Sequence, residues 1–333
     1  MTAAQRAVDL RVKLGALELE NPILTASGTF GYGLEFAHLV RLERLGGIVT
    51  KGLSPEPIRG NPPPRVCETR GGMLNSIGLQ NIGIDRFVNE VLPGLQRYPA
   101  KVIVNVFGYS IDDYVRVVTR AERAPEIAAL ELNVSCPNVE RGGIEFGHDP
   151  DALHRLVTAV RGETAKPLIV KLSPNVTSPV ELGLAARDAG ADILSCINTV
   201  LGMAIDAATR RPLINTLRGG LSGPAIKPIA LRIVFDVARK VGLPVIGIGG
   251  IETATDVVEF LLAGASAVQV GTALFRDPKT PERLLEGVER YLRESGTARV
   301  AELVGALEVP AARSSAPKSN LAERVVNTTR GAS

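Results

Sequence analysis

Lysine and asparagine side chains occur directly after short runs of apolar residues in this sequence. The positions are Lys51, Asn105, Asn133, Lys171, Asn198 and Thr199. Amide groups both donate and accept hydrogen bonds, and ammonium groups add positive charge. One polar residue at the end of a strand would mean little, because such ends often face water. Two lysines and three asparagines in equivalent places favour a site that binds a planar heterocycle together with an anionic substrate.

A further candidate for chemistry is Cys136, in the string Asn133-Val-Ser-Cys-Pro-Asn138. A free cysteine is most often a small buried residue. Here Pro137 and the glycine-containing segment 138–147 follow it, so we expect the thiol at the edge of a site, under a loop. A thiol in that place can act as a nucleophile or as a base. The nearest histidine, His148, is interpreted as a loop residue, which disfavours a cysteine–histidine pair like that of thiol proteases.

Glycines follow the last two apolar runs, as Gly249-Gly250 and as Gly271 beside Thr272. A glycine lets backbone N–H groups approach a phosphate, and the N-terminus of a following helix adds a favourable dipole. Tight turns also need glycine, so the glycines alone are weak evidence. Their position after two successive strand–helix units favours binding of a phosphate, carried by either a substrate or a cofactor.

The apolar runs predict the frame that holds these residues. Eight short runs are separated by polar or helical segments, at 22–26, 47–50, 102–106, 129–134, 168–172, 193–197, 245–248 and 267–270. Parallel strands covered by helices on both faces have this continuous apolar character. Eight strand–helix units predict an α/β protein with a closed (β/α)8 TIM barrel, and an open doubly wound sheet is the alternative.

Other local patterns predict the helices between the strands and a hairpin before the first strand. Helical periodicity predicts helices over 112–123, 149–163, 178–189 and 253–263, and the last two are followed by glycines, which are typical helix stops. The segment 10–20 predicts a β-hairpin with Gly15 at its turn, which we expect to close the floor of the barrel.

Three connections, 52–83, 138–147 and 200–224, are too long for simple barrel loops. All three follow the carboxyl ends of strands, so we expect insertions at the C-terminal face of the strands, where barrel active sites lie. We expect one barrel domain over 1–310 and a flexible tail over 311–333, where small and polar residues prevail.

The composition disfavours other classes of protein. The net charge is +3 and the basic residues are scattered, so nucleic-acid binding is not expected. The cysteines Cys67, Cys136 and Cys196 are far apart, which disfavours a metal or Fe–S site held by this chain alone. Cys67 is expected in the first long loop and Cys196 in the barrel wall. The chain has no run of 18 apolar residues, which predicts no transmembrane helix, and we interpret it as cytoplasmic.

Taken together, the motifs resemble those of class 1 dihydroorotate dehydrogenases over roughly residues 10–295. The strings are Thr25-Ala-Ser-Gly-Thr-Phe-Gly31, Asn75-Ser-Ile-Gly-Leu-Gln-Asn81, Asn133-Val-Ser-Cys-Pro-Asn138, Lys171-Leu-Ser-Pro-Asn175, Ile197-Asn-Thr199, Gly219-Gly-Leu-Ser-Gly-Pro224 and Gly247-Ile-Gly-Gly250. Each string is modestly specific, and the set is highly specific. The runs Asn198-Thr-Val-Leu-Gly-Met203 and 219–224 most resemble the 1B, NAD-linked subclass.

The resemblance implies one FMN per chain and a set of contacts. The FMN ring and ribityl chain would contact Ser27, Lys51, Gly52, Asn105, Asn133, Lys171 and Ile197. The phosphate end would lie at Gly223, Gly249, Gly250, Gly271 and Thr272. Dihydroorotate would contact Lys51, Asn75, Ser76, Ile77, Gly78, Leu79, Asn133, Asn198 and Thr199. Cys136 would be the catalytic base, assisted by Lys51, and the 138–147 loop would close over the site.

The subclass also implies partners. A second subunit would carry FAD and an Fe–S cluster and pass electrons to NAD, and the barrel would form a homodimer or a heterotetramer with that subunit. A fumarate-linked dihydroorotate dehydrogenase or a dihydropyrimidine dehydrogenase module is the nearest alternative. More distant alternatives are an aldolase or isomerase barrel with Lys171 as a Schiff-base lysine, and a barrel that binds a phosphate compound without catalysis.

Overall fold

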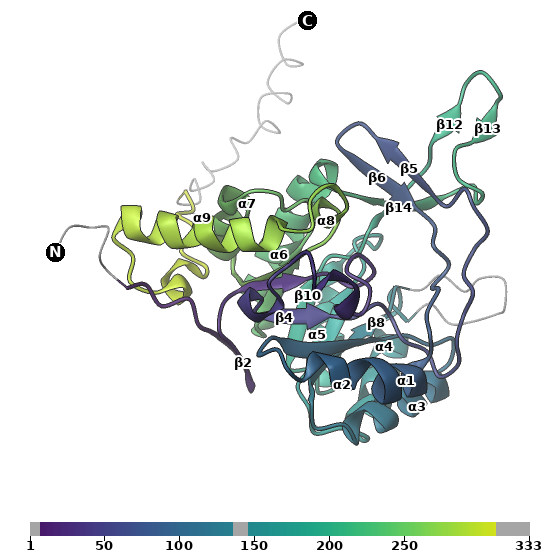
Figure 1. The fold of residues 1–333 in the computed structure, drawn as a ribbon, viewed down its shortest axis with the longest axis horizontal. Helices are drawn as coiled ribbons and strands as arrows, with labels where there is room; N and C mark the ends of the chain where they lie inside the picture. The colour runs from purple at the N-terminus through teal and green to yellow at the C-terminus, as the bar shows by residue number, and fades with distance from the viewer. Residues whose placement is uncertain (1–6, 136–145, 311–333) are drawn as a thin grey trace, which may run out of the picture.

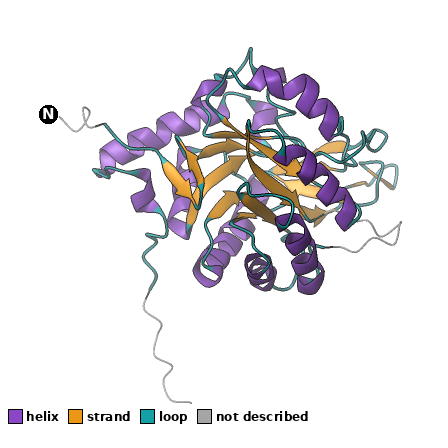
Figure 2. Ribbon diagram, turned by 90° about the horizontal axis from the view of Figure 1, so that it is seen from below, coloured by secondary structure: helices purple, strands orange, loops and turns teal. Residues whose placement is uncertain are grey.

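Eight parallel strands close into a barrel in the computed structural model, which describes residues 7–135 and 146–310. Around the barrel the order is β10-β15-β16-β3-β4-β7-β8-β9. The strands are β3 (Ile23–Thr25), β4 (Gly47–Val49), β7 (Lys101–Val106), β8 (Ile127–Asn133), β9 (Leu168–Leu172), β10 (Ile193–Cys196), β15 (Val245–Ile248) and β16 (Ala265–Val270). Each overlaps one of the predicted apolar runs, so the predicted TIM barrel is confirmed, with helices around the strands (Figures 1 and 2).

The helices follow the strands. They are α1 (Ile84–Arg86), α2 (Leu92–Leu95), α3 (Ile111–Glu122), α4 (Pro150–Arg161), α5 (Pro179–Asp188), α6 (Lys227–Val241), α7 (Ala254–Ala263), α8 (Ala273–Arg276) and α9 (Thr280–Ser295). A π-helical turn, Phe87–Val91, joins α1 to α2, and 3-10 turns span Leu34–Phe36, Leu42–Arg44, Pro224–Ile226 and Val300–Leu303. No helix in the described ranges is long and apolar enough to span a lipid bilayer.

Helix caps explain why the predicted helix starts were accurate. The side chains of Asp149, Ser178 and Thr253 each accept a hydrogen bond from a backbone N–H in the first turn of α4, α5 and α7. Such caps satisfy N–H groups that have no partner within the helix. Three of the four predicted helices began at these cap residues, and all four are confirmed, with α3 capped by Ser110 just before the predicted start at 112.

The N-terminal hairpin is also confirmed. Strand β1 (Val12–Leu14) pairs with β2 (Leu17–Leu19), and Gly15 at the turn has a φ of 61°, which favours glycine. The apolar side chains of both strands are buried, and the hairpin leads directly into the amino end of β3.

Two of the long connections contain strands that the sequence did not predict. Strands β5 (Val66–Thr69) and β6 (Gly72–Asn75) lie in 52–83, and β11 (Val200–Gly202) and β14 (Gly219–Ser222) lie in 200–224. They form one antiparallel sheet in the order β11-β14-β6-β5. A short hairpin of β12 (Ile205–Asp206) and β13 (Arg211–Pro212) projects beyond it (Figure 1). Cys67 therefore lies on β5 and not in a loop.

Candidate active site

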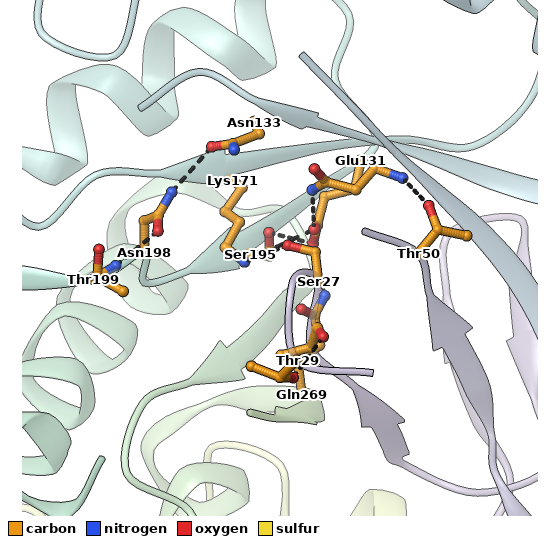
Figure 3. A network of polar contacts seen from close by, with 12 residues as sticks. Ser27, Thr29, Thr50, Glu131, Asn133, Lys171, Ser195, Asn198, Thr199 and Gln269 are labelled. Atoms are coloured by element: carbon orange, nitrogen blue, oxygen red, sulfur yellow. Dashed lines mark hydrogen bonds and ion pairs between the residues drawn. The ribbon is translucent and has the colours of Figure 1, made fainter. Parts of the chain in front are cut away.

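The carboxyl ends of the barrel strands bring the predicted polar side chains to one mouth of the barrel. Asn133 ends β8, and Asn198 follows β10. The Nδ2 group of Asn198 donates to Oδ1 of Asn133 over 3.0 Å, and Oδ1 of Asn198 accepts from the backbone N–H of Thr199 over 2.8 Å (Figure 3). These three residues, predicted separately, form one hydrogen-bonded chain.

Lys171 extends across the mouth of the barrel. It lies on β9, whereas Ser27 follows β3, four strands away in the closed order and so on the opposite side. Nζ of Lys171 donates to Oγ of Ser27 over 3.3 Å, and the residue is only 5% exposed (Figure 3). A ligand seated on the mouth would therefore meet a buried ammonium group.

Below the mouth, the predicted Asn105 and Lys171 join a polar layer with Glu131, Ser195 and Gln269, three residues that the sequence did not reveal. Glu131 on β8 is 0% exposed. Its Oε1 accepts from Asn105 over 2.7 Å, and its Oε2 accepts from Ser195 over 2.9 Å and from Gln269 over 2.6 Å. Lys171 forms an ion pair with Oε1 at 4.0 Å. The available signal was a charged residue in an otherwise apolar strand, two positions before Asn133 and hence on the same face.

Two buried polar atoms in this layer have no partner in the described part of the chain. They are Oδ1 of Asn105 and Oε1 of Gln269. Buried polar groups are normally paired, so an unpaired acceptor at the mouth of a barrel indicates a ligand with a matching donor. A Cβ atom on Gly52 would lie 2.9 Å from Oδ1 of Asn105, so glycine leaves that acceptor accessible. The set fits FMN, whose ring is flat and carries both donors and acceptors.

The glycines predicted for the phosphate end converge from different loops. Gly223 and Gly250 have φ values of 97° and 72°, and a Cβ atom on Gly250 would lie 2.8 Å from the carbonyl oxygen of Gly223. A Cβ atom on Gly223 would lie 2.8 Å from the Cα atom of Gly72, and the methyl group of Thr272 would be in ordinary contact with it at 3.6 Å. Gly249 and Gly271 stand at the carboxyl ends of the strands beside them. Because glycine has no side chain, these backbone segments can approach each other this closely. Such an arrangement suits a phosphate cradle made of backbone N–H groups.

Substitution of Gly250 with alanine should weaken FMN binding at least about tenfold, which corresponds to about 1.4 kcal/mol. The added methyl group would meet the backbone carbonyl of Gly223, which has little freedom to move. The measurement is fluorescence titration of the apo-protein with FMN. Gly242→Ala is the matched control, because Gly242 also has a positive φ, 81°, but has nothing within 4 Å of the added methyl group. Equal affinities in the two variants would refute the cradle.

The segment 75–79, assigned from resemblance alone, is tied to the mouth through the second sheet. Nδ2 of Asn75 donates to the carbonyl oxygen of Gly220 over 3.2 Å. The Cα atom of Gly220 in turn faces Thr199, since a Cβ there would lie 2.2 Å from Oγ1 of Thr199. Farther along, Gly78 and Leu79 both have positive φ values, 72° and 57°, so the chain turns sharply there. Ser76 and Ile77 anchor this turn through their backbone groups.

Lys51 follows β4 and is half-buried at the same face. Burial lowers the pKa of its ammonium group below its usual range, the positive charge of Arg65 lowers it further, and the carboxylate of Glu35 opposes both effects. A desolvated ammonium group beside another cation is the environment expected of a site that binds an anion.

The remaining predicted residues are accounted for as follows. Cys136 and most of the 138–147 loop lie outside the described residues, as does the predicted tail 311–333. Cys196 is fully buried in the barrel wall, as predicted, and burial raises the pKa of its thiol. Ile197 is buried next to it and donates its backbone N–H to Ile248 over 3.0 Å.

Comparison with known proteins points to one family. A family model described as dihydroorotate dehydrogenase matches residues 9–292. The chain is 58% identical over 299 residues to the dihydroorotate dehydrogenase B (NAD(+)) catalytic subunit of Geotalea uraniireducens (strain Rf4), covering 90% of this chain and 98% of that one. It is 58% identical over 301 residues to the protein of the same name from Geobacter sulfurreducens, covering 90% and 99%. A crystal structure of DHODH in complex with ferulenol from Eimeria tenella has the same fold, with a TM-score of 0.75 at 23% identity, over 91% of this chain and 89% of that one.

Proposed function

The chain belongs to the dihydroorotate dehydrogenase family, and we propose that it oxidises dihydroorotate to orotate in pyrimidine biosynthesis, as the catalytic subunit of an NAD-linked enzyme. One observation carries this proposal in the structure: a buried ammonium group, an amide pair and an unpaired amide oxygen share the mouth of the barrel. That combination suits a flavin ring and an anionic pyrimidine stacked on each other.

The cofactor assigned to this mouth is FMN. The residues that would hold its ring and ribityl chain are Ser27, Lys51, Gly52, Asn105, Asn133, Lys171 and Ile197, and those that would lie at its phosphate are Gly223, Gly249, Gly250, Gly271 and Thr272. When bound, FMN supplies the acceptor for the hydride that leaves C6 of dihydroorotate. Lys171 would place positive charge beside the ring, and Asn105 would offer the acceptor that is unpaired in the structure.

The substrate would be held from the other side by groups of complementary chemistry. The residues are Lys51, Asn75, Ser76, Ile77, Gly78, Leu79, Asn133, Asn198 and Thr199. The amides of Asn133 and Asn198 match the donor and acceptor edge of the pyrimidine. Lys51 would bind the carboxylate. Cys136, which lies outside the described residues, is proposed as the base that takes the proton from C5.

The role of Lys51 predicts a characteristic pH dependence. Because burial and Arg65 lower the pKa of Lys51, kcat/KM for dihydroorotate should begin to fall at a lower pH than an ordinary lysine would dictate. A guanidinium group stays charged to much higher pH, so Lys51→Arg should move this alkaline limb upward. Lys13→Arg, on the exposed N-terminal hairpin, is the control. Coincident alkaline limbs for Lys51→Arg and the wild type would contradict the assignment.

The electron-transfer partner is also part of the proposal. The relatives are named catalytic subunits, which implies a second subunit. We assign FAD and an Fe–S cluster to that subunit, since the three cysteines of this chain are too dispersed to hold a cluster. The barrel would pair with a second copy of itself, alone or within a heterotetramer. The free thiols of Cys67 and Cys196 suit the reducing cytoplasm.

The experiment that tests this function is anaerobic reduction of the purified chain. A flavin enzyme should be yellow and should bleach when dihydroorotate is added without air. Colourless protein, or yellow protein that does not bleach, would refute the proposal, and an aldolase-type barrel would give the first of these results. Re-oxidation with fumarate, or with NAD and the partner subunit, then separates the two kinds of dihydroorotate dehydrogenase. Bleaching by dihydrouracil in place of dihydroorotate would indicate a dihydropyrimidine dehydrogenase module.

A further inference from the structure

The carboxylate of Glu131 lies inside the barrel, below the groups assigned to FMN and substrate, and the function described so far does not use it. From its contacts we propose that Glu131 is a positioning residue, which orients Asn105 and Lys171 toward the cofactor and lowers the reduction potential of the bound flavin. This inference rests on the proposed function, because it presupposes that FMN occupies the mouth.

Glu131 fixes the orientation of the Asn105 amide. An ionised carboxylate only accepts hydrogen bonds, so Nδ2 of Asn105 must face Glu131, and it does so over 2.7 Å. The amide oxygen is thereby turned the other way, where it is buried and has no partner in the described part of the chain. Glu131 therefore determines that Asn105 presents an acceptor, and not a donor, to whatever occupies the mouth.

Glu131 also provides the counter-charge for Lys171. Its Nζ lies 4.0 Å from Oε1 of Glu131, and the two side chains are 6% and 0% exposed. A buried ammonium group needs a nearby negative charge, since transfer of an isolated charge from water is costly. Glu131 on one side and Ser27 on the other hold the ammonium group between the barrel interior and the mouth. Without Glu131, that group would have no counter-charge in the described part of the chain.

The buried charge of Glu131 also affects how readily a bound flavin is reduced. A reduced flavin carries more negative charge than an oxidised one, and charges in a water-excluded site interact strongly. The buried negative charge of Glu131 therefore opposes reduction and lowers the potential of the flavin. Three hydrogen bonds, from Asn105, Ser195 and Gln269, keep that charge fixed in place. The potential is therefore a readout that a loss of barrel stability alone would not move.

The test replaces Glu131 with glutamine and measures the midpoint potential of the bound flavin and the FMN affinity of the folded apo-protein. We expect the potential to become more positive and the affinity to fall at least about tenfold, as Asn105 can turn over and present its NH2 group. Ser195→Ala is the matched control, because it removes one hydrogen bond to the same carboxylate but keeps the charge. Its potential should stay close to that of the wild type.

A second variant covers the case in which Glu131→Gln fails to fold. Glu131→Gln combined with Gln269→Glu keeps one carboxylate and one amide in contact, and moves the charge from β8 to β16 on the opposite side of the barrel. The negative charge stays in the same polar layer, so the potential should shift less than in Glu131→Gln, whereas the FMN affinity should fall as in Glu131→Gln, because Asn105 no longer faces a carboxylate. A potential and an FMN affinity equal to those of the wild type, in whichever variant folds, would overturn the proposal. If the wild-type chain itself binds no FMN, it is the proposed function that fails.

Discussion

Replacement of Cys136 with alanine should leave a protein that binds FMN normally but is reduced by dihydroorotate about 10²- to 10⁴-fold more slowly, the usual contribution of a general base. The methyl group of alanine cannot accept the C5 proton of dihydroorotate. FMN binding should not change, because it is assigned to residues other than Cys136. The measurement is anaerobic stopped-flow reduction of the flavin at saturating dihydroorotate. Near-normal reduction in this variant would remove Cys136 from the mechanism.

Two further substitutions sharpen the test of Cys136. Cys136→Ser should recover part of the rate, most clearly at high pH, because a hydroxyl is a weaker acid than a thiol and a poorer base at neutral pH. Cys67→Ala removes a free thiol on strand β5 and should not change the rate. If Cys67→Ala slowed reduction as much as Cys136→Ala, the effect would reflect thiols in general and not a base at one position.

The sequence was sufficient to predict the barrel because its signals are local. Strands such as Leu168–Leu172 are buried on both faces and are therefore continuous apolar runs. Helix caps such as Asp149 bond within their own first turn, so the helix start is evident from a few neighbouring residues. Once the strands are predicted, the lysine and asparagine residues at their carboxyl ends are predicted to lie together, since parallel barrel strands all end at one face.

What the sequence could not reveal depends on partners far apart in the chain. Strand β14 is only four residues long, and its pairing with β6 joins Gly220 to Asn75 across 145 residues of sequence. Such short strands have no strong pattern of their own. The sequence did not reveal the role of Glu131 because its three hydrogen-bond donors come from three other strands. Within its own strand, Glu131 is surrounded by apolar residues, and nothing nearby in sequence indicates a polar cluster.

The pair formed by Glu131 and Lys171 predicts a large effect on stability. Lys171→Met should lower the free energy of unfolding of the apo-protein by about 3–5 kcal/mol at neutral pH, because it leaves a fully buried carboxylate without its cation. Methionine has similar length and no charge, so lost volume contributes little. Urea denaturation followed by circular dichroism measures the difference.

A double variant separates loss of the charge pair from loss of packing. In Lys171→Met combined with Glu131→Gln no unpaired charge remains, so the double variant should be more stable than Lys171→Met alone. The coupling between the two substitutions should then be at least about 1 kcal/mol. Strictly additive effects would mean that the two groups act independently despite their 4.0 Å separation. Additivity would also undercut the claim that Glu131 orients Lys171, and Glu131 would then act on the flavin only through the orientation of Asn105 and through its own buried charge.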